Sequence, residues 1–312
     1  MKLEVSIIIP VFNEEEAIPN LEEELSSVMQ TLPENCEVVF VDDGSTDRSF
    51  ELLSQIVKRR VWAKVVRLKT NFGQTQAMAA GIDESQGDIL VCMDADLQND
   101  PRDIPRLLDK MEMGYDIVSG WRADRKDKFL SRRLPSVCAN RLIGALTGVR
   151  IHDYGCSLKA YDARIMKSLH LYSDMHRFLP AIAWKCGARV TEIKVNHRPR
   201  IYGTSKYGLS RVFKVFFDLF VIKMIVDFSS RPAHYFGLIG GMFFAGGLVV
   251  VPFLIWNMVA DYRVNVVLPA VLILMLVTAL YFFLMGTLGD LIVRVGNHDA
   301  TENARSTVVE IA

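Results

Sequence analysis

The sequence predicts an α/β domain with a mostly parallel sheet, followed by a hairpin of two membrane-spanning helices. Short aliphatic segments alternate with helical patterns along the N-terminal part of the chain, which is typical of βαβ units whose sheet is covered by helices on both faces. Two uncharged apolar segments then occupy the last third, and each is long enough, at ~1.5 Å per residue, to cross a ~30 Å hydrocarbon layer.

The elements of the α/β part follow one another in a regular order. Predicted strands, each a short run rich in aliphatic residues, fall at 5–11, 37–42, 63–68, 88–94 and 115–119. Helical patterns lie between them at 14–30, 47–60, 74–84 and 101–113. After a looser basic stretch at 122–133, we expect a helix ending at 146, a strand near 158–161, a helix around 176–186 and a strand at 190–197.

The apolar segments at 235–256 and 266–289 are separated by a short loop, so they predict a hairpin with both chain termini on one side of a membrane. That loop carries only Arg263 against Asp261, whereas several basic residues precede the first segment: Lys206, Arg211, Lys214, Lys223 and Arg231. The positive-inside tendency therefore places the N-terminal domain in the cytoplasm, at the cell (inner) membrane. Two buried helices of a soluble core are the alternative.

The segment 209–228 is apolar but interrupted by Arg211, Lys214 and Asp218 at helical spacing. This pattern favours an amphipathic helix in the membrane interface, and a helix packed only on the soluble domain is the alternative. The short polar tail after Asp290 is expected either to be disordered or to dock on a neighbouring subunit of a homo-oligomer. The expected organisation is a cytosolic domain at 1–208, the interfacial region at 209–231, two transmembrane helices within 232–290, and a cytosolic tail at 291–312.

Composition bounds the class of protein. The 36 basic and 36 acidic residues balance, which gives no reason to expect a nucleic acid partner, and the mean hydropathy of +0.20 is high for a soluble enzyme. The five cysteines are scattered without a Cys-x-x-Cys spacing, which favours reduced core residues in a cytosolic domain. We expect no signal peptide, because acidic residues interrupt the N-terminal apolar segment early.

Acidic residues follow a strand at the point where α/β sheets bind ligands. Asp94 and Asp96, with Gln98 after them, end the apolar run at 88–93, and ligands bind beyond the carboxyl ends of parallel strands. Two carboxylates and an amide oxygen could hold a hard divalent cation and leave coordination positions for a diphosphate. The same acids would also suit a helix N-cap before Pro101.

A second group of acidic and turn-forming residues is expected at the same edge. The first strand leads into Phe12, Asn13 and Glu14, and the second leads into Asp42-Asp43-Gly44-Ser45. An acid at a strand end could accept from a nucleobase N–H or a ribose hydroxyl, although an ordinary capped turn would look the same. The chain has no Gly-x-Gly-x-x-Gly and no Walker lysine motif, which counts against dinucleotide and ATP binding.

In this order, four motifs resemble the family-2 inverting glycosyltransferases of GT-A fold, which have a Rossmann-like sheet. The motifs are Ile9-Pro10-Val11-Phe12-Asn13-Glu14, Asp42-Asp43-Gly44-Ser45, Asn71-Phe72-Gly73-Gln74 and Asp94-Ala95-Asp96-Leu97-Gln98. With Arg200, Gly203, Ser205-Lys206-Tyr207 and two C-terminal spans, the chain is similar to the polyprenyl-phosphate branch, which includes dolichyl-phosphate mannose synthases and bactoprenol glucosyltransferases. The likeness covers essentially the whole chain.

The resemblance implies transfer of a sugar from a nucleotide donor, with a UDP-sugar favoured, to the phosphate of a membrane polyprenol such as undecaprenyl phosphate. It implies that Asp42 contacts the donor base and that Asp94 faces the ribose or diphosphate. It also implies that Asp96 and Gln98 hold Mg²⁺ or Mn²⁺. The remaining implied donor-binding residues are Pro10, Phe12, Glu14, Gly73, Arg200, Ser205 and Lys206.

On the acceptor side, the resemblance implies that Arg122, Arg132 and Ser136 bind the acceptor phosphate, with Arg133 an alternative to Arg132. A phosphate monoester has a second pKa of ~6 and hardly needs a general base. Asp153, at the position often assigned as the base, is therefore expected to orient the sugar or acceptor, and an ordinary turn acid before Gly155 is the alternative. A solvated basic loop or lipid headgroup contacts are the alternatives for the arginines.

Because the two-span architecture resembles the bactoprenol glucosyltransferases, the resemblance implies glucose from UDP-glucose first, while a 4-amino-arabinose derivative from a UDP donor and mannose from GDP-mannose stay open. A processive polysaccharide synthase is disfavoured, because the chain lacks Gln-x-x-Arg-Trp and has too few spans for a translocation channel. A membrane-anchored nucleotide-sugar binding protein without catalysis is the alternative from another class. The complete set of acids and the acceptor-side arginines argue against it.

Overall fold

A computed structural model divides the chain into two units, Met1–Leu219 and Phe220–Ala312, each of which is described by itself. The residues that the structure describes are 4–33, 35–123, 140–141, 143–144, 147–169, 175–199, 232–260 and 266–307. The expected interfacial helix at 209–231 lies outside these residues.

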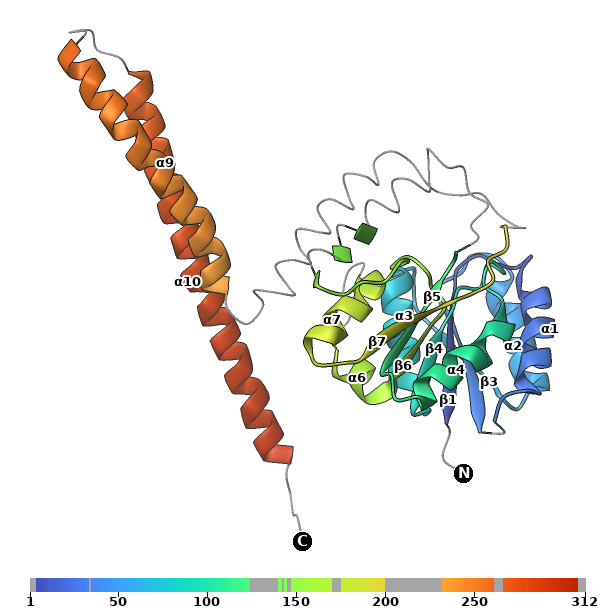
Figure 1. Ribbon diagram of the computed structural model, residues 1–312. Coiled ribbons are helices and arrows are strands. Elements are labelled where there is room, and N and C mark those ends of the chain that lie inside the picture. The colour runs from blue at the N-terminus through green and yellow to red at the C-terminus, as the bar shows by residue number, and fades with distance from the viewer. Residues whose placement is uncertain are drawn as a thin grey trace. The chain divides into compact units, whose positions relative to one another are not determined.

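The first unit is built on a seven-stranded sheet with the order β3-β2-β1-β4-β6-β5-β7 (Figure 1). Every neighbouring pair is parallel except the two that β6 makes with β4 and β5. The strands are β1 (Val5–Val11), β2 (Cys36–Asp42), β3 (Ala63–Arg67), β4 (Ile89–Cys92), β5 (Ile117–Trp121), β6 (Lys159–Asp162) and β7 (Val190–Lys194). The predicted mostly parallel α/β sheet is confirmed.

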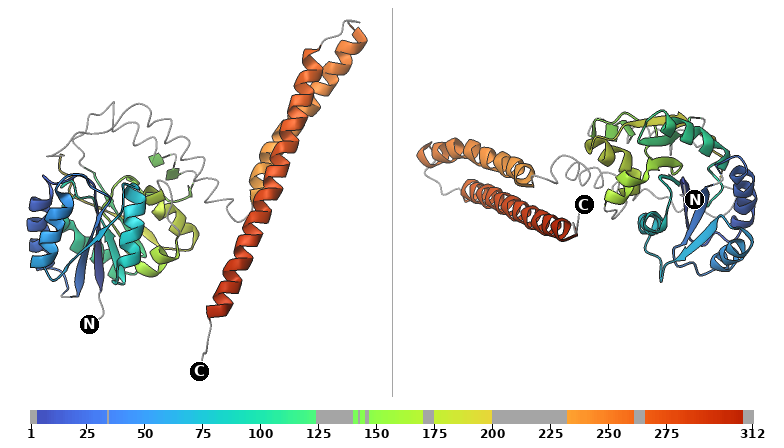
Figure 2. Two further views of the ribbon diagram at one scale, coloured as in Figure 1. Left: turned by 180° about the vertical axis from the view of Figure 1, so that it is seen from behind. Right: turned by 90° about the horizontal axis from the view of Figure 1, so that it is seen from below.

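Helices cover both faces of this sheet (Figures 1 and 2). One face packs on α1 (Ile18–Met29), α2 (Ser49–Arg59) and α4 (Ile104–Glu112), which follows the 3₁₀ turn η1 (Pro101–Asp103). The other face packs on α3 (Gln74–Glu84), α6 (Ala163–Ser168) and α7 (Leu179–Lys185), which follows η3 (Met175–Arg177). Both layers are therefore formed by helices that connect the strands.

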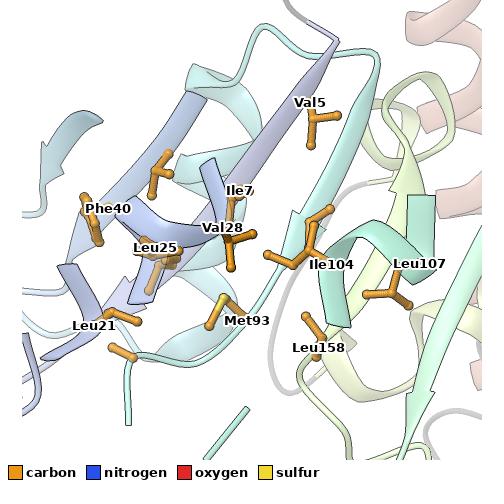
Figure 3. Close-up of a cluster of buried hydrophobic side chains, with 14 of the residues drawn as sticks. Val5, Ile7, Leu21, Leu25, Val28, Phe40, Met93, Ile104, Leu107 and Leu158 are labelled. Atoms are coloured by element: carbon orange, nitrogen blue, oxygen red, sulfur yellow. The ribbon is translucent and has the colours of Figure 1, made fainter. Parts of the chain in front are cut away.

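The central strand β1 shows why these residues form this sheet. Ile7 and Ile9 point to the layer of α1 and α4, while Ile8 points to the layer of α3, and all three are fully buried. Figure 3 shows the first of these layers, in which Leu21, Leu25 and Val28 of α1 and Ile104 and Leu107 of α4 pack over Ile7, Phe40 and Met93. A strand buried on both faces has a nearly continuous run of apolar residues, and that pattern predicted β1.

Two element boundaries differ from the predicted ones for a reason that concerns the site. The helix expected to begin at Glu14 begins at Ile18, because the backbone of Glu14 and Glu15 bonds instead to Ser49 and Asp47. The strand expected to reach 197 ends at Lys194, because the segment after it turns to contact the loop that follows β4. In both places, the residues form loops at one edge of the sheet instead of a helix or a strand.

The second unit is a hairpin of α9 (Pro232–Ala260) and α10 (Val267–Thr307). Pro232–Ala260 and Val267–Val293 are long and apolar enough to cross a membrane, as the sequence predicted. A Cβ added at Gly240 would lie 3.0 Å from the carbonyl oxygen of Ala279, so glycine permits the helices to approach closely there. α10 continues through Thr307, so residues 291–307, expected as a disordered or docked tail, extend the second helix.

Candidate active site

The candidate site lies at the edge of the sheet where β1, β2, β4 and β5 end. Because β6 runs in the opposite direction, its first residue lies at this same edge, where Lys159 pairs with Cys92 of β4 and Ser119 of β5. The segment that leads into β6 contains Asp153. The topology thereby brings Asp42, Asp94, Arg122 and Asp153 to one edge from four places in the sequence.

Asp42 is a fully buried carboxylate at the end of β2, where a nucleobase contact was expected. Its Oδ1 accepts a hydrogen bond from Ser45 N at 3.2 Å. Its Oδ2 has no hydrogen bond within the described part of the chain, although Arg67 Nε lies 3.4 Å away. Burial of an acceptor without a hydrogen bond costs free energy, so an N–H from a ligand would stabilise this oxygen.

The loops after β1 and β2 are joined to each other by hydrogen bonds. Asn13 adopts a left-handed φ of 54°, its N–H donates to Ser45 Oγ, and its Oδ1 accepts from Thr46 N at 2.8 Å. Sheet pairing places Val11 opposite Asp42, so Pro10 at the end of β1 and Phe12 and Glu14 in the loop after it lie at the same edge as Asp42 at the end of β2.

Asp43 was assigned no role from the sequence, and it positions the loop that carries Gly73. Its two carboxylate oxygens accept from Phe72 N at 2.8 Å and from Gly73 N at 2.9 Å. Gly73 has a φ of 93° and precedes α3 directly. The adjacent acids of Asp42-Asp43 thus have different surroundings: one faces the end of the sheet, and the other fixes the loop before α3.

Gly44 permits the close approach of these two loops. It has a φ of +68°, and an added Cβ would lie 2.5 Å from the carbonyl carbon of Thr70. We expect Gly44→Ala to raise the donor KM about tenfold and to cost about 1–3 kcal/mol of stability, because left-handed strain and a backbone clash act together. Donor kinetics and thermal unfolding measure the two effects.

Gly187→Ala is the matched control. Gly187 has a similar φ of +92°, but an added Cβ there would meet nothing within 4 Å. It should cost only about 1 kcal/mol and leave the donor KM unchanged. An unaltered donor KM in Gly44→Ala would show that the contact with Thr70 does not position the donor loop.

Asp94 and Asp96 face different partners after β4. Asp94 Oδ1 accepts from Gln74 Nε2 at 2.6 Å, which ties it to the first residue of α3. Asp96 is 7% exposed, and its Oδ1 accepts from Gln98 N at 3.1 Å. Leu97, between them, has a left-handed φ of 61°, a strained conformation of the kind found at ligand sites. The turn therefore holds Asp96 and Gln98 together.

The donor atoms at this turn fit a divalent cation. Asp96 and Gln98 offer carboxylate and amide oxygens, the ligands that Mg²⁺ and Mn²⁺ prefer. Within the described ranges, no three His, Cys, Asp or Glu side chains form a group that could hold a metal ion.

Arg122 and Asp153, expected in separate roles, form one buried ion pair. Arg122 Nε lies 2.7 Å from Asp153 Oδ2, and Nη2 lies 2.9 Å from Oδ1. Their side chains are 13% and 4% exposed. Burial opposes the charge of Arg122, but the hydrogen bonds that Arg122 donates to Asp153 outweigh it and raise the arginine pKa above its usual value. Gly155 N also donates to Asp153 Oδ1, at 3.1 Å.

A further ion pair anchors the segment after β7 to the turn that contains Asp96 and Gln98. Arg198 N donates to the carbonyl oxygen of Gln98 at 2.9 Å, and its guanidinium bonds to Asp100 Oδ2 at 2.9 Å and to Glu24. Burial disfavours the charge of Asp100, but hydrogen bonds from Arg102 and Arg198 outweigh it and lower the pKa of that carboxyl. Arg198 was missed from the sequence because nothing in its local pattern indicated a partner 98 residues away.

Several predicted site residues lie outside the described residues, namely Arg132, Arg133, Ser136, Arg200, Ser205 and Lys206. Two histidines near this edge bond to protein groups: His176 Nδ1 lies 2.7 Å from Thr75 Oγ1, and His152 stacks on Trp121 and pairs with Glu192. Gln74 was quoted only as part of a motif, and its contact with Asp94 gives that motif a physical role.

A protein-family model described as Glycosyl transferase family 2 matches residues 6–169. This segment runs from β1 to the end of α6, so it contains the loops after β1, β2 and β4 and the Arg122–Asp153 pair.

Two curated relatives extend the likeness. The chain is 46% identical over 244 residues to a dodecaprenyl-phosphate galacturonate synthase from Rhizobium johnstonii, which covers 76% of this chain and 72% of the relative. It is 38% identical over 252 residues to an undecaprenyl-phosphate 4-deoxy-4-formamido-L-arabinose transferase from Pseudomonas paraeruginosa, which covers 80% of this chain and 73% of the relative.

Among solved structures, the chain is similar to glucosyl-3-phosphoglycerate synthase from Mycobacterium tuberculosis, determined with Mn²⁺, UDP and phosphoglyceric acid. The TM-score is 0.57 at 18% identity, over 73% of this chain and 81% of that one. At this identity the likeness shows the fold alone, which is of the GT-A type.

Proposed function

The chain belongs to glycosyltransferase family 2, in its polyprenyl-phosphate branch, and on that premise we propose that it moves one sugar from a UDP donor to the phosphate of a membrane polyprenol, with inversion at the anomeric carbon. The observation that carries the proposal is the meeting of acids and a buried arginine at one sheet edge. Asp94 follows β4 and Arg122 is the residue after β5, and both strands pair with β6, so the donor-side and acceptor-side groups lie at nearby strand ends.

On the donor side, Asp42 accepts from the base through the oxygen that has no hydrogen bond in the described protein. Pro10, Phe12 and Glu14 line the base pocket, and Gly73 lets the backbone before α3 approach the donor. Asp94, held by Gln74, faces the ribose or diphosphate. Arg200, Ser205 and Lys206 are assigned to the diphosphate by resemblance alone.

Asp96 and Gln98 are the residues that would hold Mg²⁺ or Mn²⁺. When bound, the cation supplies Lewis-acid stabilisation of the negative charge on the departing diphosphate. The protein contributes a buried carboxylate whose position is fixed by the turn at Leu97. Gln98 is fixed in turn by its carbonyl bond to Arg198 N.

On the acceptor side, Arg122 binds the phosphate of the polyprenol, together with Arg132 and Ser136. The phosphate is largely dianionic at neutral pH, so one of its oxygens attacks the anomeric carbon without loss of a proton to a base. Asp153 accepts hydrogen bonds from Arg122 N, Arg122 Nε, Arg122 Nη2 and Gly155 N. A carboxylate so fully engaged orients Arg122 rather than removing a proton.

The membrane supplies the second substrate. A polyprenol is held in a bilayer by its hydrocarbon chain, and Pro232–Ala260 and Val267–Val293 have the length and composition to keep the enzyme there. The excess of basic residues before the first span supports a catalytic domain and both termini on the cytoplasmic side of the inner membrane. Assembly into a homo-oligomer is part of the same proposal.

The transferred sugar is the least constrained part of the proposal. The two spans favoured glucose from UDP-glucose, but the relatives are named for galacturonate and formamido-arabinose transfer. Because a relative at 46% identity carries more weight than a count of spans, we place UDP-galacturonate first, ahead of UDP-glucose. A UDP-4-amino-arabinose derivative and GDP-mannose complete the panel.

The test is transfer of labelled sugar by the full chain in liposomes that contain undecaprenyl phosphate. Each of the four donors is offered with Mg²⁺ or Mn²⁺ and with chelator, and the anomeric configuration of the lipid product is read by NMR. We expect one UDP-sugar to yield an inverted sugar-phosphate lipid. Metal-dependent nucleotide binding without product from any donor would leave a non-catalytic nucleotide-sugar binding protein.

A further inference from the structure

Lys159 is a buried cation to which the proposed reaction assigns no role. It is the first residue of β6 and is 2% exposed. In the sheet it stands between Cys92 of β4 and Ser119 of β5, at the edge that carries the site. Lysine is rarely buried so completely, because removal of an ammonium group from water is costly.

The ammonium group supports the backbone next to Asp153. Lys159 Nζ donates to the carbonyl oxygen of Tyr154 at 3.0 Å, its one hydrogen bond among the described residues. Tyr154 links Asp153 to Gly155, whose N–H donates to the same carboxylate that holds Arg122. Tyr154 is itself fixed, because its hydroxyl donates to Val149 O at 2.7 Å. Lys159 therefore braces the segment that sets the position of Asp153, and through it Arg122.

Lys159 adds a positive charge to a cluster of titratable groups. The titratable groups that act on it are Cys156, Asp153, Arg122 and Cys92. Burial raises the pKa of Cys92 to about 12 and that of Cys156 to about 11, so both thiols are neutral at physiological pH. Arg122 and Asp153 cancel each other, and Asp94 also acts on Arg122, so Lys159 supplies the positive charge that offsets this second carboxylate.

We propose that Lys159 is a positioning residue for the acceptor phosphate: its ammonium group braces the Asp153–Gly155 segment and adds to the buried Arg122–Asp153 pair a positive charge that attracts a phosphate dianion. The inference rests on the proposed function and deepens its acceptor side. Arg122 alone is neutralised by Asp153, so without Lys159 the cluster would offer a dianion a fork of donors but no positive charge in excess of its carboxylates.

The proposal has a consequence in pH. Burial lowers the pKa of Lys159 to about 8, with Cys156 and Asp153 opposing the shift. The positive charge is therefore present below pH 8 and is lost as the pH rises through that value. The acceptor becomes dianionic above its second pKa of ~6. Acceptor kcat/KM should thus be maximal between these limits and fall by about tenfold above the upper one.

The experiment measures acceptor and donor kinetics of the full chain in liposomes from pH 6 to 10. The variants are Lys159→Arg, which keeps the charge at every pH, and Lys159→Met, which removes it. Lys167→Met is the matched control, because Lys167 Nζ also donates to a backbone carbonyl, that of Ser85 at 2.7 Å, in α6 at the far end of β6.

We expect Lys159→Met to raise the acceptor KM about tenfold at pH 7, with the donor KM and the control unchanged. Lys159→Arg should restore the low acceptor KM and abolish the alkaline fall. A loss confined to kcat, or a wild-type acceptor KM that is constant from pH 7 to 9.5, would overturn the proposal. The dependence of the wild-type acceptor KM on pH tests the proposal even if neither variant folds. Absence of transfer by the wild type with every donor would instead refute the proposed function.

Discussion

Asp96→Asn is expected to lower kcat for sugar transfer by about a thousandfold, because the site loses the charge that would hold the cation against the leaving diphosphate. Asp96 is 7% exposed, and its Oδ1 already accepts from Gln98 N. Asparagine has nearly the same shape and can accept that bond, so the fold and membrane insertion should be preserved. The measurement is kcat over a range of Mg²⁺ and Mn²⁺ concentrations.

Asp109→Asn is the matched control for this loss. Asp109 lies on α4 with an exposed side chain, so the same chemical change should leave kcat unaltered. Excess metal should restore part of the activity of Asp96→Asn, because a weakened site fills at higher concentration. Full turnover of Asp96→Asn at ordinary metal levels would show that the cation is held elsewhere.

The sheet could be predicted from the sequence because its strands are buried on both faces. Residues such as Ile7, Ile8 and Ile9 have to be apolar whichever way they point, which leaves an unbroken aliphatic run. The acids that follow such runs were predicted to meet at one edge, since parallel strands end together. The structure places Asp42, Asp94 and Asp96 at that edge, at the end of β2 and after β4.

The connections between distant loops could not be predicted in this way. Arg122 and Asp153 are 31 residues apart, and they meet because β6 pairs antiparallel with β4 and β5 and so brings the start of β6 to the edge. Nothing in a run of four residues indicates the direction in which it pairs. Lys159 illustrates the same limit, because a lysine beginning a short strand predicts an exposed side chain.

The predicted boundaries of a helix and a strand were wrong where backbone groups at the candidate site form hydrogen bonds with distant loops. Glu14 and Glu15 follow β1 in a pattern typical of a helix start, but their N–H groups bond to Ser49 and Asp47 across the edge. Local propensity is a weak prior at such positions, and contacts with a distant loop override it. The deviations therefore coincide with the loops that form the candidate site.

The second large effect is expected at Arg122. Arg122→Ala should raise the KM for polyprenyl phosphate about a hundredfold, because two charge-assisted hydrogen bonds to a dianion are lost, while the donor KM changes little. Arg122→Lys should have an acceptor KM between those of the wild type and Arg122→Ala, since an ammonium group supplies charge without the paired N–H donors of a guanidinium. Acceptor titrations in liposomes, with the donor saturating, give these values. A change in donor affinity alone would remove Arg122 from the acceptor site.

Arg122→Ala also leaves the carboxylate of Asp153 buried without its cation, which can cost about 3–5 kcal/mol of stability. The double variant Arg122→Ala with Asp153→Asn removes that unpaired charge and should recover much of the stability. Thermal unfolding of the wild type, Arg122→Ala and the double variant therefore separates loss of the fold from loss of acceptor binding.

The same double variant determines what Asp153 does. If Asp153 acts only by holding Arg122, Asp153→Asn should raise the acceptor KM when Arg122 is present and add little once Arg122 is alanine. If Asp153 removes a proton, its replacement should lower kcat by a similar large factor in both backgrounds. The hydrogen bonds that its carboxylate accepts from Arg122 and Gly155 favour the first result, because an oxygen engaged with a guanidinium is a poor base. Strong coupling in acceptor KM with little change in kcat would therefore identify Asp153 as the residue that aims Arg122 at the phosphate.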